Sequence, residues 1–347
     1  MRRALTVIAL VAGMLATAAG ASATAVQEPD RPGHDGVGVR LVDVPVARAE
    51  DPRARAYVID HVAPGDVIER RVEVSNGTRS PADISVYPAA ADIGGGGFIG
   101  AEGHTANELS SWTSVTPREP TLAARGATFV DVTIKVPDDA ASGEHYGVVW
   151  AEMTTPPPDG LGVTQVSRAG VRLYVSVGPG GEPVSDFKIT SLTPGRADDG
   201  TPFVQANVHN TGGRALDLRG TLRLSDGPGG LSAGPFDVTL GTTLGLDQTE
   251  PVTVPLDKAL PAGPWRARIS IESGLLERTA KATITFPDTG LGDAVPTEQD
   301  GGFPWWWAAA GMALLLLLIF LIAFLYRRQS SDDRQLVPTV PVDGHRA

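Results

Sequence analysis

Three aromatic residues around a run of glycines are the strongest candidates for ligand contact in this sequence. Four glycines at positions 94–97 precede Phe98, and Tyr87 and Trp112 flank this insertion. Aromatic faces stack on sugar rings and anchor protein interfaces, so Tyr87, Phe98 and Trp112 form the predicted ligand-binding set. Two interpretations of the insertion stay open: a loop tip that meets a partner, or a plug that packs onto its own domain. Trp150, centred in an apolar stretch, is expected in the core.

Residue types suited to catalysis or metal binding do not occur at useful spacings. The six histidines form no His-Glu-x-x-His pair, and the chain has neither a Gly-x-Ser-x-Gly elbow nor a phosphate-binding Gly-x-x-x-x-Gly-Lys loop. His145 beside Glu144 is expected to be a solvated pair at the entrance of a strand, and the acidic pairs at 138–139 and 198–199 predict turns. We therefore predict no catalytic, metal-binding or cofactor-binding residue, and no enzyme.

Composition and charge narrow the class of partner. The formal net charge of −11 opposes binding to nucleic acid or to anionic wall polymers, whereas neutral sugars and protein surfaces remain open. Cysteine is absent, so no disulfide or thiolate site exists. Only four of the 29 basic residues are lysine. The absence of cysteine favours a protein of the bacterial cell envelope, because a eukaryotic surface sandwich more often carries a disulfide, and the excess of arginine over lysine indicates a GC-rich genome.

Two-residue alternation dominates the segment 36–178. Val130, Val132 and Ile134 alternate with polar residues, and Val171 and Leu173 repeat the pattern. Such strands have one buried and one wet face, as in antiparallel sheets packed into a sandwich, and Pro, Gly, Asn and Asp clusters separate them. No window of about a dozen residues outside the two terminal apolar segments has a helical period. We predict an immunoglobulin-like β-sandwich over 36–178.

A second immunoglobulin-like sandwich is predicted over 183–287. The Gly- and Pro-rich segment 178–183 interrupts the first pattern and marks the domain boundary. Seven short strands follow at the spacing typical of this fold: 184–191, 203–209, 216–224, 236–240, 252–256, 265–272 and 280–286. A faint repeat links the two domains, because a predicted strand ends in Val-x-Asn in each of them, at Asn76 in the first domain and at Asn210 in the second. Convergent strand and turn composition is the alternative explanation of this repeat. Asn76-Gly77-Thr78 itself is expected to be a hairpin turn.

The two ends of the chain predict a membrane topology. Arg2 and Arg3, an apolar run at 4–19 and small residues after it predict a signal peptide over 1–25. The uncharged segment 305–326, with three tryptophans at one end and two arginines beyond the other, predicts one transmembrane helix. A flexible stalk is expected over 288–304 and a cytoplasmic tail over 327–347. The segment 286–290 is similar to a sortase signal, an alternative to a retained helix.

The first domain resembles the N-terminal peptidoglycan-binding domain of the WxL-interacting protein family. The resemblance covers roughly residues 37–177 and depends on six short segments: 64–66, 72–78, 109–112, 130–137, 142–143 and 146–149. The family implies an immunoglobulin-like fold, one membrane helix after two domains, and attachment to peptidoglycan or to WxL-bearing surface proteins. The second domain matches the family's partner-binding module only in position and general type.

These observations lead to one principal hypothesis and two alternatives. The chain is expected to be a single-pass protein with extracellular domains, which binds peptidoglycan, another wall glycan or a surface protein as a non-catalytic scaffold or adhesin. The alternatives are an envelope hydrolase, which would need a cleft lined by convergent His, Asp or Ser, and a transmembrane sensor that signals through its tail.

Overall fold

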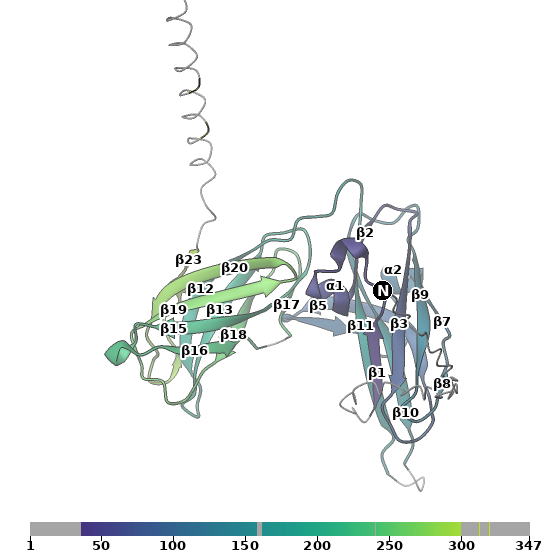
Figure 1. The fold of residues 1–347 in the computed structure, drawn as a ribbon, viewed down its shortest axis with the longest axis horizontal. Helices are drawn as coiled ribbons and strands as arrows, with labels where there is room; N and C mark the ends of the chain where they lie inside the picture. The colour runs from purple at the N-terminus through teal and green to yellow at the C-terminus, as the bar shows by residue number, and fades with distance from the viewer. Residues whose placement is uncertain (1–35, 158–161, 240, 300–311, 313–318, 320–347) are drawn as a thin grey trace, which may run out of the picture.

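Two β-sandwiches follow each other along the chain (Figure 1). The computed structural model describes residues 36–157, 162–239 and 241–299, together with Met312 and Ile319. The prediction of a predominantly β fold made of sandwiches is confirmed. Within the described residues, no helix has both the length and the apolar character needed to cross a membrane. The predicted signal peptide, the cytoplasmic tail and all but two residues of the predicted span 305–326 lie outside the described residues.

The first sandwich packs a four-stranded sheet against a five-stranded sheet. The four-stranded sheet has the order β1 (Val37–Leu41), β3 (Val67–Asn76), β9 (Ala127–Lys135) and β7 (Thr113–Thr116). The five-stranded sheet has the order β2 (Val58–Val62), β11 (Gln165–Val177), β10 (Gly143–Thr155), β5 (Ser85–Gly94) and β6 (Gly97–Gly100). A small pair, β4 (Ala82–Asp83) with β8 (Thr121–Leu122), lies beside them.

Alternation along the strands produces the core between these sheets. Val130, Val132 and Ile134 of β9 are at most 1% exposed and face Val149 and Leu173 from the other sheet's strands within one cluster. Each such side chain contributes about 1.5–3 kcal/mol through the apolar surface that it removes from water. The inner face of the five-stranded sheet therefore packs against the four-stranded sheet, and a binding surface on this sheet would lie on its outer face.

Short helices connect the strands of the first sandwich. They are η1 (Val46–Arg48), α1 (Pro52–Ala56) and α2 (Glu108–Trp112). Asp51 caps α1 by accepting the Arg53 N–H at 2.8 Å, and Asn107 and Ser110 form a capping box at α2. Five residues make fewer than two helical turns, too few for a periodic signal, which explains why the sequence pattern did not predict them.

The second sandwich begins at Phe187, after β11 has ended at Val177. One sheet has the order β18 (Thr249–Pro255), β13 (Pro202–Asn210), β12 (Phe187–Arg196) and β21 (Gly290–Leu291), with β22 (Val295–Pro296) also paired to β12. The other has the order β16 (Ala233–Asp237), β15 (Arg219–Ser225), β19 (Trp265–Ser273), β20 (Leu276–Ile284) and β23 (Glu298–Gln299). The remaining elements are β14 (Leu216–Asp217), which pairs with β17 (Thr243–Leu244), and η2 (Pro228–Gly230).

The segment expected to be a flexible stalk is partly built into the second sandwich. Its strands β21 and β22 pair with β12, and β23 pairs with β20. Edge strands present unpaired backbone groups, and the C-terminal segment satisfies some of them here. Val295 also packs against the second core. The expectation of a stalk over 288–304 therefore does not hold for residues 290–299.

The two asparagines of the internal repeat form equivalent hydrogen bonds. Asn76 and Asn210 are each 1% exposed at the end of a strand. The Asn76 amide donates to the carbonyls of Ser80, Leu122 and Ala123, and the Asn210 amide donates to those of Arg214 and Gly245. Each side-chain oxygen also accepts the backbone N–H two residues ahead. The turn after Asn76 is thus an Asx turn and not the expected hairpin, because β3 pairs with β1 and β9 and not with β4.

Candidate binding surface at the domain junction

The outer face of the five-stranded sheet of the first sandwich carries aromatic and apolar side chains, of which Tyr87 and Val148 are buried and Trp150 is half-buried. On β10, Val149 and Ala151 point into the core, so Tyr146, Val148 and Trp150 point outward. Two small clusters form on this face, one around Tyr87 and Val148 and the other around Tyr174. A sheet face that does not meet the opposing sheet but carries aromatic side chains is a candidate for contact with another surface.

Trp150 belongs to this outer face, so its predicted place in the core is wrong. It is half-buried, and its Nε1 donates to the Ala101 carbonyl at 2.9 Å. A Cβ on Gly170 would lie 2.5 Å from the Trp150 ring, and one on Gly100 would lie 2.6 Å from it. Both glycines therefore leave the space that the indole fills. The Arg168 guanidinium lies 5.4 Å from the ring centroid, within cation–π range.

Tyr87 lies beside Trp150 on the neighbouring strand, at the directly opposed position. Its hydroxyl donates to Glu152 Oε2 at 2.6 Å, and Arg168 Nε donates to the same oxygen at 2.9 Å. Burial, followed by the hydrogen bond to Glu152, raises the pKa of Tyr87 to about 12. The exposed ring of His104 lies over Tyr87 at 4.1 Å. The carboxylate and the guanidinium are each about a quarter exposed, so they form a polar rim for the aromatic cluster.

Phe98 and the glycine run lie at the junction with the second sandwich. The glycines form the tip of the β5–β6 hairpin, and the Gly96 carbonyl accepts the Thr243 N–H of β17 at 2.8 Å. Phe98 lies 5.3 Å from Tyr174 and 4.8 Å from the Arg172 guanidinium. Of the two open interpretations, the plug holds for Phe98, which packs onto its own sandwich against Tyr87, Val148 and Tyr174, whereas the glycine tip contacts the second sandwich through the Gly96 carbonyl.

The structure brings Tyr87 and Phe98 to one face of the sheet but places Trp112 elsewhere. Both Tyr87 and Phe98 contact the cluster around Val148. Trp112 ends α2 and packs against the main core of the first sandwich, and its ring lies 4.8 Å from the tilted ring of His145. The three predicted ligand-binding residues therefore do not form one site.

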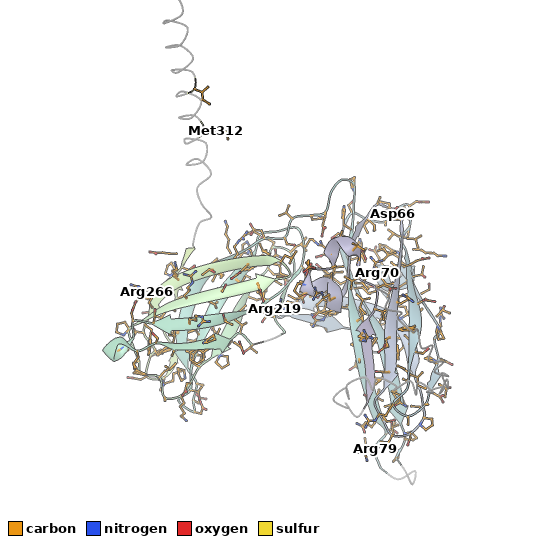
Figure 2. The ribbon with its side chains drawn as sticks, in the orientation of Figure 1. Asp66, Arg70, Arg79, Arg219, Arg266 and Met312 are labelled. Carbon is orange, nitrogen blue, oxygen red and sulfur yellow. The ribbon has the colours of Figure 1, made fainter. Side chains whose placement is uncertain are left out.

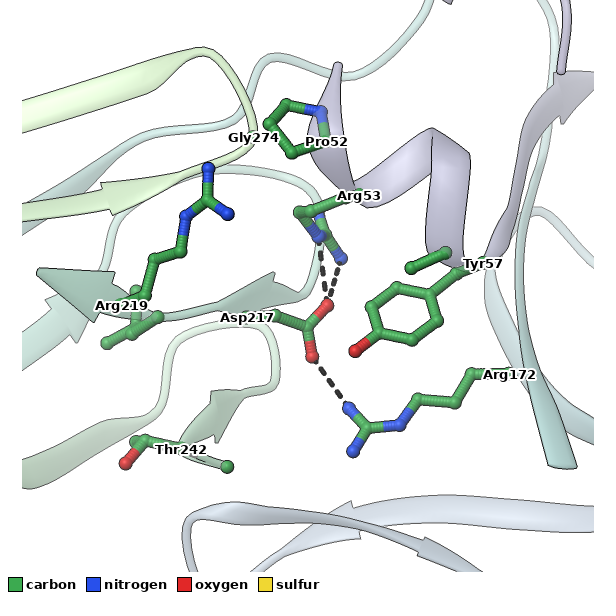
Figure 3. Close-up of a pocket in the computed structure, with 11 residues that line it drawn as sticks. Pro52, Arg53, Tyr57, Arg172, Asp217, Arg219, Thr242 and Gly274 are labelled. Carbon is green, nitrogen blue, oxygen red and sulfur yellow. Dashed lines mark hydrogen bonds and ion pairs between the residues drawn. The ribbon is translucent and has the colours of Figure 1, made fainter. Parts of the chain in front are cut away.

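A buried carboxylate joins the two sandwiches (Figure 3). Asp217 of β14 accepts hydrogen bonds from Arg53 at 2.9 Å and from Arg172 at 2.9 Å, both residues of the first sandwich. Tyr174 and Thr243 also donate to its Oδ1, at 3.0 and 2.9 Å. Asp217 and Arg53 are only 15% and 10% exposed, so little water screens this charge pair.

A second carboxylate, from the first sandwich, accepts a hydrogen bond from the second sandwich. Glu144 of β10 is 2% exposed and accepts the Ala215 N–H at 2.6 Å and the Tyr146 hydroxyl at 2.8 Å. Burial raises the pKa of Glu144, although these hydrogen bonds and Arg214 act in the opposite direction. The expectation of a solvated Glu144–His145 pair is therefore wrong. His145 instead lies 3.2 Å from Glu108 and bonds to the Ala141 carbonyl at 2.9 Å.

Two cavities flank this network of charges. One, of about 240 Å³, is lined by residues from both sandwiches that include Arg53, Tyr57, Arg172, Asp217, Leu218 and Thr242 (Figure 3). The other, of about 330 Å³, is lined by residues that include Arg48, Glu182, Ser185, Arg214 and Ser273. Glu182, in the connection between the domains, forms ion pairs with Arg48 and Arg214. Burial lowers the pKa of Arg214 to about 10, so it stays charged at neutral pH.

The junction could not be found from sequence patterns. Arg53 and Asp217 are 164 positions apart, and Arg172 and Asp217 are 45 apart. An isolated charged residue in a short or alternating segment is usually solvated, so its partner emerges only from the fold. Within the described residues, no group of three or more His, Asp or Glu side chains is placed to hold a metal ion.

Comparisons with known proteins place the chain in no family. No family model and no curated protein matches it. Similar solved structures include the CupB2 chaperone of Pseudomonas aeruginosa, with 13% identity, a TM-score of 0.36, and coverage of 66% of this chain and 98% of that one. The E. coli chaperone DraB has 12% identity and a TM-score of 0.35, with coverage of 70% and 95%. The SafA pilin–SafB chaperone complex of Salmonella enterica has 11% identity and a TM-score of 0.37, with coverage of 75% and 95%. At this level the likeness assigns the chain no partner.

Proposed function

We propose that the chain is a membrane-anchored protein of the bacterial cell surface, which binds peptidoglycan without catalysing a reaction. The predicted signal peptide and terminal span support the location, and the resemblance of residues 37–177 to the WxL-interacting family supports the ligand. A WxL-type or other surface protein is the second partner that the resemblance implies.

One observation carries the proposal: an aromatic cluster with a polar rim on an outer sheet face. Trp150 is half-buried there, with Glu152 and Arg168 beside it at 23% and 25% exposure. Sugar rings have apolar faces that stack on indole, and hydroxyls that hydrogen-bond to carboxylates and guanidinium groups. Peptidoglycan also carries neutral sugar units, which the net charge of −11 does not repel.

Sedimentation with insoluble peptidoglycan tests this proposal. The detergent-solubilised full chain should sediment with the wall material, and the double variant Glu152→Gln/Arg168→Gln should lose most of that binding because its rim can no longer offer charged hydrogen bonds. Trp150→Ala should have the same effect. Phe129→Ala is the matched control, because Phe129 is a 53% exposed aromatic residue of β9, outside the five-stranded sheet.

The outcomes distinguish whether the chain binds peptidoglycan from whether the aromatic cluster is the binding site. If the wild-type chain does not sediment and crosslinking on intact cells recovers no surface protein, the proposed function is wrong. If it sediments and all variants bind equally, the wall is the ligand but the aromatic cluster is not the site. Circular dichroism of each variant checks that the β fold is retained.

A further inference from the structure

The outer face of the β18-β13-β12-β21 sheet, in the second sandwich, carries no charged side chain over three consecutive cross-strand rows. Val204, Ala206 and Val208 of β13 belong to the core, so the residues between them point outward. Charged residues make up 20% of the chain and normally occupy such wet faces, which makes their absence here a specific feature. Across β18, β13 and β12, the rows are Pro251–Asn207–Ser191, Thr253–Gln205–Thr193 and Pro255–Phe203–Gly195.

The other sheet of the same sandwich has a charged outer face. Arg219 lies on it near the domain junction and Arg266 at the opposite end (Figure 2). Arg268, Glu272 and Lys281 also point outward from this sheet, because they alternate with residues of the core. The neutral face is therefore a property of one sheet and not of the whole domain. It has no charge with which to balance that of an ionic ligand.

The middle neutral row offers hydrogen-bonding groups that the fold does not use. Gln205 lies directly opposite Thr193 on one side and Thr253 on the other. All three side chains are half-buried, and none of them hydrogen-bonds to another described residue. In the next row, the Asn207 amide donates to Ser191 Oγ at 3.0 Å. An amide and two hydroxyls in one row provide neutral donors and acceptors side by side.

Phe203 supplies an apolar surface beside this polar row. A Cβ on Gly195 would lie 2.4, 2.6 and 2.9 Å from three atoms of the Phe203 ring, so the ring lies across the directly opposed glycine of the neighbouring strand. The ring is half-buried, with one face against the sheet and the other toward solvent. Leu291, which is 61% exposed, continues the row beyond Gly195. Trp150 has the same arrangement over a glycine in the first sandwich.

These features suit a neutral sugar chain better than the other classes of ligand. A pyranose ring has an apolar face that stacks on an aromatic ring, and its hydroxyls both donate and accept hydrogen bonds. A polyanion would find no cation in these rows, and a protein partner would need a larger apolar centre than one row provides. Rows two residues apart lie about 6.7 Å apart along a strand, so the three rows span about 13 Å, enough for more than one sugar ring.

We propose that this neutral face binds an uncharged polysaccharide, with a pyranose ring stacked on Phe203 and sugar hydroxyls bonded to Gln205 and the two threonines of its row. The site goes beyond the proposed function, because it belongs to the second sandwich and requires neither the aromatic cluster of the first nor the membrane anchor. One glycan site on each sandwich would hold a wall polymer at two points, and two linked sites bind a polymer more tightly than either does alone.

Isothermal titration calorimetry with the hexasaccharide of N-acetylglucosamine tests the site. The detergent-solubilised full chain carries Trp150→Ala, which removes the stacking ring of the first sandwich and isolates the second. This chain should still bind the hexasaccharide, and adding Phe203→Ala/Gln205→Ala should weaken binding about tenfold. Phe129→Ala/Thr133→Ala is the matched control, because it removes an aromatic and a polar side chain two positions apart on β9 in the first sandwich, and it should leave binding unchanged.

Two further measurements protect the result against misfolding and against unselective binding. Gln205→Ala alone should also weaken binding while the circular dichroism spectrum stays unchanged, because this side chain has no hydrogen-bond partner in the described fold to lose. The hexasaccharide of galacturonic acid has the same number of sugar rings but is charged, and it should bind more weakly than the neutral one.

Each other outcome overturns the proposal in a recognisable way. Loss of binding with Trp150→Ala alone would assign all sugar binding to the first sandwich and leave the proposed function intact. Binding that survives Phe203→Ala/Gln205→Ala, or equal binding of the charged sugar, would show that this face is not the site. A surface protein photocrosslinked from position 205 on intact cells, without sugar binding, would assign the face to a protein. If the wild-type chain neither binds the hexasaccharide nor sediments with peptidoglycan, the proposed function is wrong as well.

Discussion

Asp217 offers the sharpest test of how the two sandwiches are held together. Its carboxylate accepts hydrogen bonds from two arginines of the first sandwich and from Tyr174 and Thr243. Asp217→Ala would leave Arg53, which is 10% exposed, beside Arg172 with no carboxylate between them. Breaking a buried ion pair by removing one partner costs about 3–5 kcal/mol. The variant should lose about that much of the free energy that holds the domains together.

Urea unfolding followed by tryptophan fluorescence measures this loss. Of the six tryptophans in the sequence, Trp112 and Trp150 report on the first sandwich and Trp265, 1% exposed, reports on the core of the second. The wild-type chain should unfold in one transition. At a urea m-value of about 2 kcal/mol/M, a loss of 3–5 kcal/mol should lower the midpoint by about 1.5–2.5 M or divide the curve into two transitions.

The matched control removes an exposed ion pair from the neighbouring strand. Arg219 and Glu272 are 45% and 41% exposed, so Arg219→Ala should cost less than about 1 kcal/mol. Asp217→Asn should lie between the two, because an amide keeps one acceptor but turns a donor toward an arginine. If Asp217→Ala and Arg219→Ala shift the midpoint equally, the buried charges do not hold the sandwiches together.

Three further perturbations follow from the same contacts. Asn210→Ala removes the donor to two carbonyls and should lower the free energy of unfolding by about 2–5 kcal/mol in urea titrations, whereas Asn207→Ala, at a half-buried position, should cost less than about 1 kcal/mol. Burial raises the folded-state pKa of Glu144 above 4.5, so the stability of the wild-type chain should fall as pH rises above 4.5. Glu144→Gln should flatten this dependence. Thermal unfolding at several pH values would refute the prediction if the melting temperatures of the wild type and the variant changed equally with pH. Gly170→Ala should cost about 1–3 kcal/mol and shift Trp150 emission, because its Cβ would meet the ring, and an unchanged spectrum would contradict the packing that we describe.

The β architecture could be predicted because it depends on local periodicity. β9 alternates between apolar and polar residues over 130–135, and its apolar set, Val130, Val132 and Ile134, is buried in the core. Trp150 shows the limit of that reasoning. It also alternates in register, but its side of β10 faces outward, and only the sheet order shows which side is covered by the opposing sheet.

The junction escaped prediction for a different physical reason. The sequence does not show whether a charged side chain is solvated or binds a residue far along the chain. Glu144, for example, accepts a hydrogen bond from the Ala215 N–H, 71 positions away. The stalk failed similarly, since Val295 follows no periodic pattern and is ordered by edge pairing with β12. Local patterns report which face of a strand is apolar, whereas buried ion pairs and edge strands depend on the assembled fold.

The position of the buried charges bears on how a bound partner would act on the molecule. The aromatic cluster and the Asp217 network share the outer face of one sheet, because Trp150 and Arg172 both point away from the core on β10 and β11. Because Arg172 and Arg53 bond to Asp217 of β14, we expect load applied to a ligand on this face to reach the second sandwich through these bonds. If the junction transmits load in this way, Asp217→Ala should leave peptidoglycan affinity unchanged but lower the force at which the two sandwiches separate in single-molecule pulling. A separation force equal to that of the wild-type chain would show that backbone contacts such as Thr243 N–H to the Gly96 carbonyl are sufficient.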